Sequence, residues 1–151
     1  MATKKAILVS ACLLGTPCRY DGASKPVDAV RALQEKYTLI PICPEVLGGL
    51  PTPRTPSEII GTRVMMRDGR DVTENYRRGA EEALRTALEN GCALAILKEK
   101  SPSCGNGKVY DGSFTGTLTD GDGITAAYLK AHGIRVVGEH EIDSDIQSED
   151  L

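Results

Sequence analysis

Short runs of Ile, Leu, Val and Ala recur along the chain, and segments rich in Gly, Pro or charged residues separate them. The runs at 6–11, 38–43, 93–98 and 134–137 are mostly continuous rather than alternating, which is typical of strands buried on both faces of a parallel sheet. A further short strand is predicted at 63–66.

Apolar residues spaced three and four apart predict helices between these strands. One helix begins near Pro26, because proline is favoured in the first turn. The clearest helix begins at Thr73, a good N-cap residue, and ends at Asn90 and Gly91. Another is predicted at 124–132.

The remaining segments have the composition of loops. The stretch 44–56 holds four prolines and two glycines and is predicted to be a long loop, a feature that is often functional in a compact domain. The Gly-rich stretch 101–123 is expected to contain a small hairpin at 109–117. The acidic tail, residues 139–151, is expected to fray.

Strands that alternate with helices indicate βαβ units. The predicted fold class is therefore α/β, with residues 1–151 forming a single three-layer doubly wound domain around a mainly parallel sheet. No internal repeat or linker interrupts the pattern.

Composition excludes several classes of function. The 151 residues carry a net charge of −3, which argues against binding a nucleic acid polymer, because phosphate contact needs a surplus of Lys and Arg. The absence of Trp and the single Phe also argue against a series of base-stacking platforms. No apolar run approaches the roughly 18 residues of a membrane span.

The five cysteines are too few for a disulfide-built domain, and an odd number cannot pair completely. Reduced thiols and a cytoplasmic location are expected. The start MATKKAILVSACLL is similar to a lipoprotein signal, but its apolar stretch is short, and a buried first strand fits it better.

Three cysteines lie at the ends of predicted strands: Cys12 follows the first, Cys43 closes the second, and Cys104 lies just past the strand at 93–98. Ligands of an open parallel sheet bind beyond the carboxyl ends of its strands, so these thiols are expected to converge there, although buried packing is an alternative. Cys18 lies in the loop after Cys12 and is a possible fourth ligand. Cys92 precedes its strand and is expected at the opposite edge, in a packing role.

Three converging thiols are suited to a soft metal centre. A closed zinc site usually has four ligands in paired Cys-x-x-Cys units, which this chain lacks. A cubane iron–sulfur cluster with three cysteine ligands keeps one open iron, a Lewis acid suited to sulfur. Metal-free thiol chemistry of the small tyrosine phosphatase type is a rival, but Arg19 lies one place too late after Cys12.

The blocks SACLLGTPCRYDG, CPEVLGGLPTPRTPSEI, ILKEKSPSCG and FTG…GDGITAAYLK occur in order over nearly the whole chain. In sequence and order they resemble the thiouracil desulfidase family, long known only as a bacterial domain of unknown function. The resemblance implies a 4Fe–4S cluster held by three cysteines, which carry over to Cys12, Cys43 and Cys104. It also implies non-redox replacement of sulfur in a small thiolated pyrimidine by oxygen from water.

The resemblance further assigns acid/base roles to Glu45 and Ser101, each close in sequence to a proposed ligand. Arg19 and Arg54 lie in the two loops and are candidates for binding a polar substrate, unless they pair with Asp21 or Glu58. A cluster-bearing redox or iron sensor is the principal alternative to an enzyme. Whether the chain forms a homodimer stays open.

Overall fold

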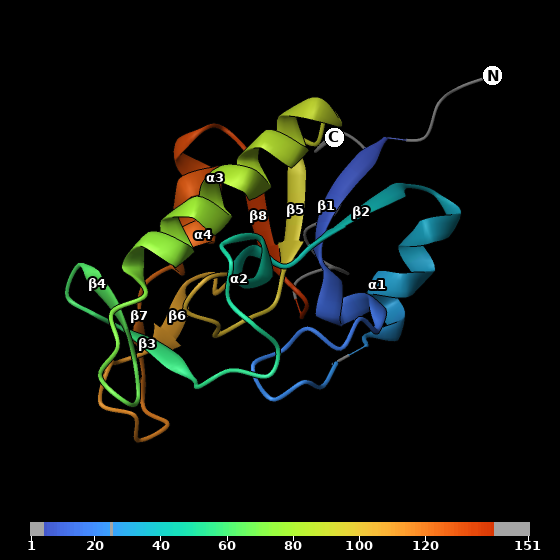
Figure 1. Cartoon of the computed structure of the whole chain (residues 1–151). Coiled ribbons are helices and arrows are strands. Elements are labelled where there is room, and N and C mark those ends of the chain that lie inside the picture. The colour runs from blue at the N-terminus through green and yellow to red at the C-terminus, as the bar shows by residue number, and fades with distance from the viewer. Residues whose placement is uncertain (1–4, 25, 141–151) are drawn as a thin grey trace.

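The computed structural model describes residues 5–24 and 26–140, and its core is one parallel sheet (Figure 1). Four strands pair in the order β2–β1–β5–β8, and every pairing is parallel. The bounds are Ala6–Ser10 for β1, Thr38–Ile42 for β2, Leu94–Leu97 for β5 and Arg135–Gly138 for β8. All four are strands that the continuous apolar runs predicted.

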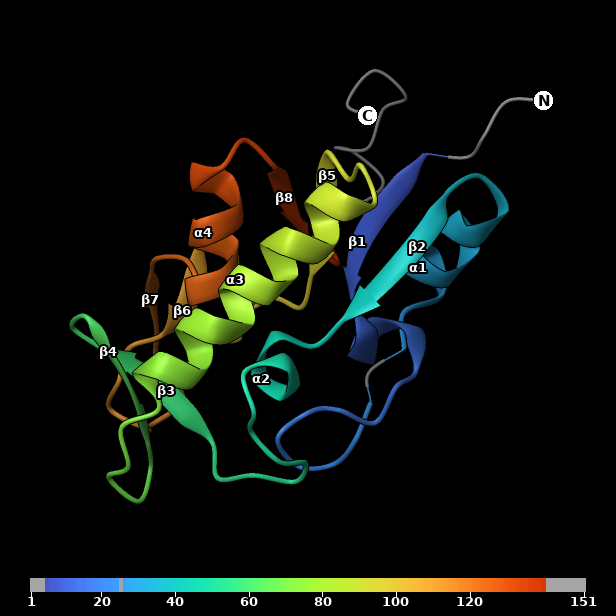
Figure 2. The same cartoon turned by 45° about the horizontal axis from the view of Figure 1, so that its top comes forward.

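Helices cover both faces of this sheet. α3 (Thr73–Glu89) and α4 (Ile124–Ala131) lie side by side on one face (Figure 2), where their apolar residues pack on Leu8 and Ala95. The other face carries Ile7 and Val9, which pack with residues of the following short helices. These are the 3-10 helix η1 (Ala11–Leu14), α1 (Asp28–Ala32) and the 3-10 helix η2 (Leu33–Glu35). The expected three-layer α/β fold is confirmed.

The strand order creates a crevice at one point of the sheet. From β1 the chain passes through α1 to its neighbour β2, and from β5 it passes through α4 to its neighbour β8 on the other side of the sheet. The two connections therefore leave β1 and β5 in opposite directions, which opens the space beyond the carboxyl ends of this central pair. This is the position at which a doubly wound fold binds its ligands.

Two antiparallel hairpins lie outside the main sheet and contact each other. β3 (Ser57–Ile60) pairs with β4 (Arg63–Met66), and β6 (Lys108–Tyr110) pairs with β7 (Leu118–Asp120). The sequence predicted β4 but missed β3, which directly follows the proline-rich stretch. It also placed the second hairpin at 109–117, whereas its paired strands flank a loop at 111–117.

Two local predictions were wrong. The stretch 44–56 is not entirely a loop, because Pro44–Leu47 forms the short helix α2, with proline in its favoured first position. Thr73 is not an N-cap: Val72 holds that position. The Thr73 hydroxyl instead accepts the N–H of Val64 at 2.8 Å, which ties α3 to β4. The end of α3 at Asn90 agrees with the prediction.

The segment after β8 begins with packed rather than frayed residues. Glu139 is buried, and its carboxylate accepts the N–H of Glu99 at 2.6 Å and lies 3.4 Å from the Lys98 Nζ. The His140 ring pairs with Glu99 at 2.9 Å. Residues 141–151 of the expected acidic tail lie outside the described residues.

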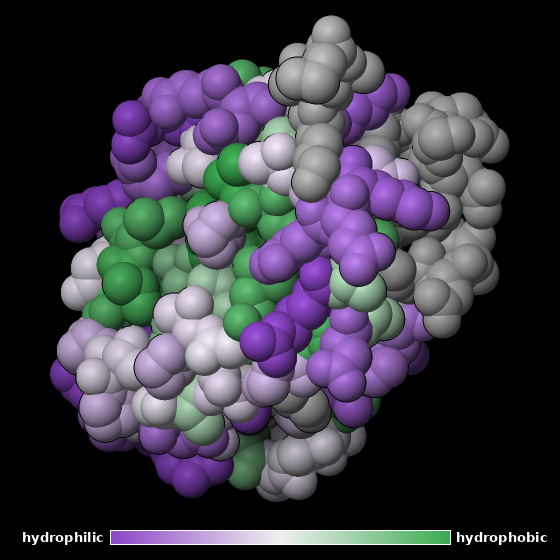
Figure 3. All heavy atoms as spheres, turned by 90° about the vertical axis from the view of Figure 1, so that its right-hand side faces the viewer, coloured by the Kyte–Doolittle hydropathy of each residue, from purple (hydrophilic) through white to green (hydrophobic). Residues whose placement is uncertain are grey.

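β2 is an edge strand and contains Pro41, which is tolerated there because only one neighbour needs backbone hydrogen bonds. Figure 3, seen from the side on which β2 and α1 lie, shows hydrophobic surface near the middle of this face and hydrophilic side chains around it. In the described part of the chain, no helix combines the length and apolar character needed to span a bilayer.

Candidate active site

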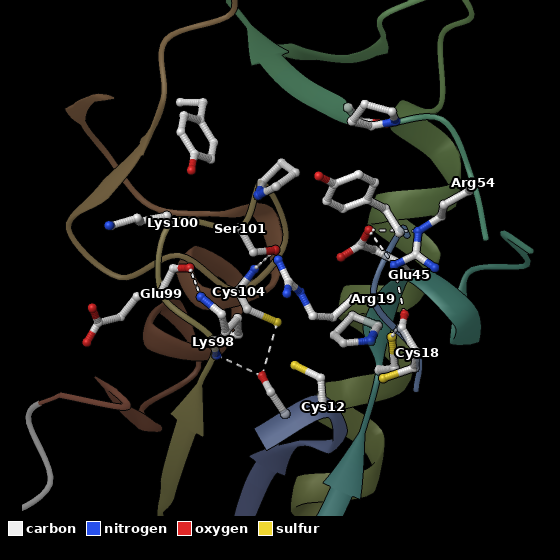
Figure 4. A pocket seen from close by; sticks show the side chains of 18 of the residues that line it. Cys12, Cys18, Arg19, Glu45, Arg54, Lys98, Glu99, Lys100, Ser101 and Cys104 are labelled. Carbon is white, nitrogen blue, oxygen red and sulfur yellow. Dashed lines mark hydrogen bonds and ion pairs between the residues drawn. The ribbon is translucent and has the colours of Figure 1, made fainter. Parts of the chain in front are cut away.

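A cavity of about 610 Å³ opens beyond the carboxyl ends of the sheet strands. Four cysteines line it, namely Cys12, Cys18, Cys43 and Cys104 (Figure 4). The structure thus brings together the three cysteines that the sequence placed after separate strands, together with Cys18. Cys92 packs in the core between α3 and the sheet, as its position before β5 predicts.

Each of the three strand-end cysteines is fixed by the element that carries it. Cys12 is in η1, directly after β1, and is buried. Cys43 is the N-cap residue of α2, directly after β2, and its Sγ lies 3.7 Å from the Cys18 carbonyl oxygen. Cys104 follows β5, and the buried Ser10 hydroxyl donates to its Sγ at 3.4 Å. Ser10 is the last residue of β1, and its hydroxyl also accepts the N–H of Lys98, the residue after β5. Ser10 therefore links the ends of the two central strands, β1 and β5.

The loop that carries Cys104 is held by the beginning of α4. The N–H groups of Ile124 and Thr125 donate to the carbonyls of Pro102 and Ser103, both at 2.8 Å. A side chain at Gly123 would overlap the Ser103 backbone, with a Cβ only 2.4 Å from its carbonyl oxygen. The loop therefore satisfies N–H groups that a helix start leaves unpaired, and Asp122 does not cap the helix through its side chain.

Ser101 shapes the same loop through its hydroxyl oxygen. Oγ accepts the N–H groups of Ser103 and Cys104, both at 3.1 Å. A serine hydroxyl has two lone pairs and one O–H donor. Because both lone pairs are occupied, Ser101 retains one O–H group that can donate into the cavity.

The Cys43 and Cys104 thiols lie in surroundings that favour their neutral form. Burial raises the pKa of the Cys104 thiol to about 12. Contact with the Cys18 thiol, and then burial, raises the pKa of Cys43. A metal centre reverses this preference, because thiolate is the form that binds the metal.

The spacing of the sulfur atoms differs from that of a zinc site. Ligand sulfurs of a tetrahedral zinc lie roughly 3.8 Å apart, given Zn–S bonds of about 2.3 Å. Within residues 5–24 and 26–140, no three cysteine sulfurs lie within 4.8 Å of one another. No three of these thiols therefore have the spacing of a single tetrahedral zinc site.

Glu45 faces the thiols from the first turn of α2, and its two carboxylate oxygens have different surroundings. Oε2 accepts the Tyr76 hydroxyl at 3.1 Å, Arg54 Nε at 3.1 Å and Arg54 Nη2 at 3.0 Å. Oε1 has no partner among the described residues and faces the cavity (Figure 4). The carboxylate is therefore fixed by one oxygen and open at the other.

Two close backbone contacts position α2 against α3. A Cβ at Gly48 would lie 1.9 Å from the Asn75 carbonyl oxygen, and a Cβ at Gly79 would lie 2.0 Å from the Pro44 carbonyl oxygen. Both distances are far inside van der Waals contact, so only glycine fits at either position. Glu45 is thereby anchored to the longest helix of the protein.

A family model described as 2-thiouracil desulfurase matches residues 7–141 of the sequence. The chain belongs to the 2-thiouracil desulfurase family. This agrees with the resemblance to thiouracil desulfidases that the sequence motifs indicated. The match includes all four cysteines of the cavity and Glu45.

Two relatives extend the comparison beyond the 2-thiouracil desulfurase family model. The uncharacterized protein YbbK of Bacillus subtilis (strain 168) is 44% identical over 147 residues, covering 91% of this chain and 97% of YbbK. The solved structure of the 4Fe–4S-dependent thiouracil desulfidase TudS is 49% identical, with a TM-score of 0.88. The match covers 92% of this chain and 93% of TudS.

The two arginines expected to bind substrate have different surroundings in this 2-thiouracil desulfurase family member. The Arg54 side chain is 3% exposed, and its guanidinium is committed to Glu45 and to the carbonyls of Pro51 and Cys18. Arg19 is half-buried and lines the cavity, and its guanidinium has no ion pair or hydrogen bond within the described ranges. Arg54 is thus suited to positioning Glu45, whereas Arg19 can meet a substrate.

Sequence reasoning missed Tyr76 in this member of the 2-thiouracil desulfurase family. Tyr76 belongs to the regular apolar stripe of α3, and nothing in that spacing distinguishes a core residue from one that touches the site. Its ring is buried in a core cluster with Val64 and Met66, while its hydroxyl reaches Glu45. A buried tyrosine needs a partner for its hydroxyl, which was the available signal.

Proposed function

We propose that this protein is a cytoplasmic iron–sulfur-dependent desulfidase acting on thiouracil-type rings. The observation that carries the proposal is the convergence of Cys12, Cys43 and Cys104 on one cavity with the half-anchored Glu45 carboxylate. The 49% identity to a 4Fe–4S-dependent thiouracil desulfidase supports the same activity. The reaction is C=S + H₂O → C=O + H₂S, which balances without an oxidant or a reductant.

The donor set in the cavity fits an iron–sulfur cluster, because cysteine thiolates are its usual ligands. Cys12, Cys43 and Cys104 would hold the cluster, since they follow three different strands of the sheet and line one cavity. A cluster with three protein ligands supplies an open iron, a Lewis acid that binds soft sulfur and makes it a better leaving group.

The protein's own groups supply the proton transfers. Water attacks the ring carbon that carries sulfur, and Glu45 Oε1 takes a proton from it. Tyr76 and Arg54 hold Oε2 and so keep Oε1 directed at the cavity. The Ser101 O–H donates a hydrogen bond to the substrate, because its lone pairs are occupied by the loop. Glu45 returns the proton that it took from water to the sulfur, which leaves as hydrosulfide, and the remaining hydroxyl proton of the attacking water is released as C=O forms, completing H₂S.

Anaerobic iron and sulfide analysis of cysteine variants, combined with turnover of 2-thiouracil, tests the proposal. Changing any one of Cys12, Cys43 and Cys104 to Ala should remove most of the iron and the activity. Cys92→Ser is the control, because Cys92 is buried like Cys12 and Cys104 but lies away from the cavity. An iron-loaded protein that turns over no thiouracil would favour the sensor alternative instead.

A Cys18 variant distinguishes a three-cysteine from a four-cysteine site, because Cys18 contacts the Cys12 and Cys43 thiols. Cys18→Ser is expected to keep the iron and the activity. Loss of iron in this variant would mean a four-cysteine site without an open iron, and the reaction above would be wrong. A requirement for an electron donor in every turnover would contradict it equally.

A further inference from the structure

Phe114 is the only phenylalanine of the chain and lines the same cavity as Glu45, Ser101 and Cys104. Its backbone φ is +59°, in the left-handed region that bulky residues rarely adopt. Conformations of this kind persist where the surrounding structure enforces them, and they cluster at functional sites. The half-buried ring is therefore held at the cavity by the fold of its loop.

A buried carboxylate enforces this conformation. Glu58 of β3 is 8% exposed, and its Oε1 accepts the N–H of Gly112 at 2.9 Å and that of Phe114 at 3.1 Å. A side chain at Gly112 would approach the Ile59 carbonyl oxygen to 2.8 Å, so the loop lies directly against β3. Side-chain hydrogen bonds from Ser113 and Thr115 further restrict the loop.

One side of the Phe114 ring already has a partner. The guanidinium of Arg67, another residue of the cavity, lies over the ring at 5.7 Å from its centroid. This contact occupies one side of the ring. Three tyrosines also line the cavity, but the Tyr76 hydroxyl is committed to Glu45 and Tyr20 is 42% exposed, which leaves Tyr110 as the competitor.

We propose that Phe114 is the specificity residue of this site and that a planar pyrimidine ring stacks on it while its sulfur faces the cysteines. The inference rests on the proposed function and names the part of the substrate that the site selects. Stacking is available to any flat heteroaromatic ring and unavailable to an acyclic thioamide. Phe114 therefore favours thiolated rings over small open-chain thiocarbonyl compounds.

Steady-state kinetics of Phe114→Leu with 2-thiouracil and with thiourea tests this role. Leucine keeps an apolar side chain at the same φ but has no aromatic face. For 2-thiouracil we expect KM to rise about 5- to 100-fold, the scale of losing one base–aromatic stack, with kcat changed by less than about twofold. For thiourea KM should stay unchanged. Tyr110→Leu tests the competing platform, and its KM for 2-thiouracil should rise less than that of Phe114→Leu.

An unchanged KM in Phe114→Leu, or a larger rise in Tyr110→Leu, would overturn the inference. Loss of iron in Phe114→Leu would also overturn it, because the residue would then support the fold rather than the substrate. If the unmodified protein turns over no thiouracil, the proposed function fails, and a binding measurement must decide on Phe114 separately.

Tryptophan fluorescence allows this binding measurement, because the chain has no Trp of its own. Phe114→Trp introduces a single tryptophan at the proposed platform, and uracil, the product ring, should quench its selectively excited fluorescence to a saturating level. Leu88→Trp is the control, because Leu88 is 64% exposed on α3 and does not line the cavity. Quenching that is absent, or equal in both variants, would rule out stacking at Phe114.

Discussion

Replacing Glu45 by glutamine separates proton transfer from every other role of this side chain. Three donors from Tyr76 and Arg54 converge on Oε2, so the amide oxygen should occupy that place. The NH₂ group then replaces Oε1 at the cavity, where it cannot accept a proton. The substitution keeps the shape of the side chain and removes only the base.

The magnitudes follow from the same contacts. Turnover should fall by about 100-fold or more, the usual scale for losing a general acid or base. Stability should fall by about 2 kcal/mol, less than the roughly 3–5 kcal/mol for an orphaned buried charge. The expected loss of stability is smaller because Arg54, only 3% exposed, keeps the carbonyls of Pro51 and Cys18 as partners.

The assay follows loss of the thiocarbonyl absorbance of 2-thiouracil under anaerobic conditions, with iron content and urea unfolding measured on the same preparation. Glu82→Gln is the control, since Glu82 pairs with Arg85 on the exposed side of α3, and the same chemical change there should alter neither activity nor iron. Full activity in Glu45→Gln with normal iron would refute the general-base role. A large rise in KM would show instead that Glu45 binds the substrate.

Two further predictions concern the groups beside Glu45. Tyr76→Phe removes one of three donors to Oε2 and should lower kcat about tenfold and stability by about 1 kcal/mol, with KM and iron content unchanged, as measured by kinetics and urea unfolding. An unchanged kcat would mean that Arg54 alone positions the carboxylate. Ser101→Ala should slow turnover less than Glu45→Gln does. It should also speed iron loss to a chelator, because Oγ caps the loop of Cys104; iron loss at the normal rate would contradict this structural role.

The sequence predicted the central sheet because its strands read as short apolar runs, most clearly in β1 and β5, which are buried on both faces. The convergence of Cys12, Cys43 and Cys104 followed from the same strands, since parallel strands end at one edge. The short helix α2 could not be predicted in this way. Its sequence PEVL lies among prolines and glycines, and packing against α3 stabilises it rather than local propensity.

Which distant side chains pair with each other was the second feature that could not be predicted from the sequence. The sequence offers Glu58 as a possible partner of Arg54. In the structure Arg54 instead pairs with Glu45, and Glu58 accepts the backbone N–H groups of Gly112 and Phe114. Both carboxylates lie in polar, loop-flanked sequence, and only the tertiary structure decides which one meets a cation. The same holds for Tyr76, whose hydroxyl projects from a core position of α3.

The contact between α2 and α3 at Gly48 and Gly79 also determines how much the protein can vary over evolution. The groups of α3 that set the position of Glu45 are main-chain atoms at Asn75 and Gly79 and the inward-facing side chains of Asn75 and Tyr76. The outward residues of α3, such as Glu74 and Arg85, can therefore be exchanged to adjust solubility or thermal tolerance while the chemistry stays in place. Gly48 and Gly79 cannot be exchanged in this way, because even one added methyl group would separate α2 from α3 and displace Glu45.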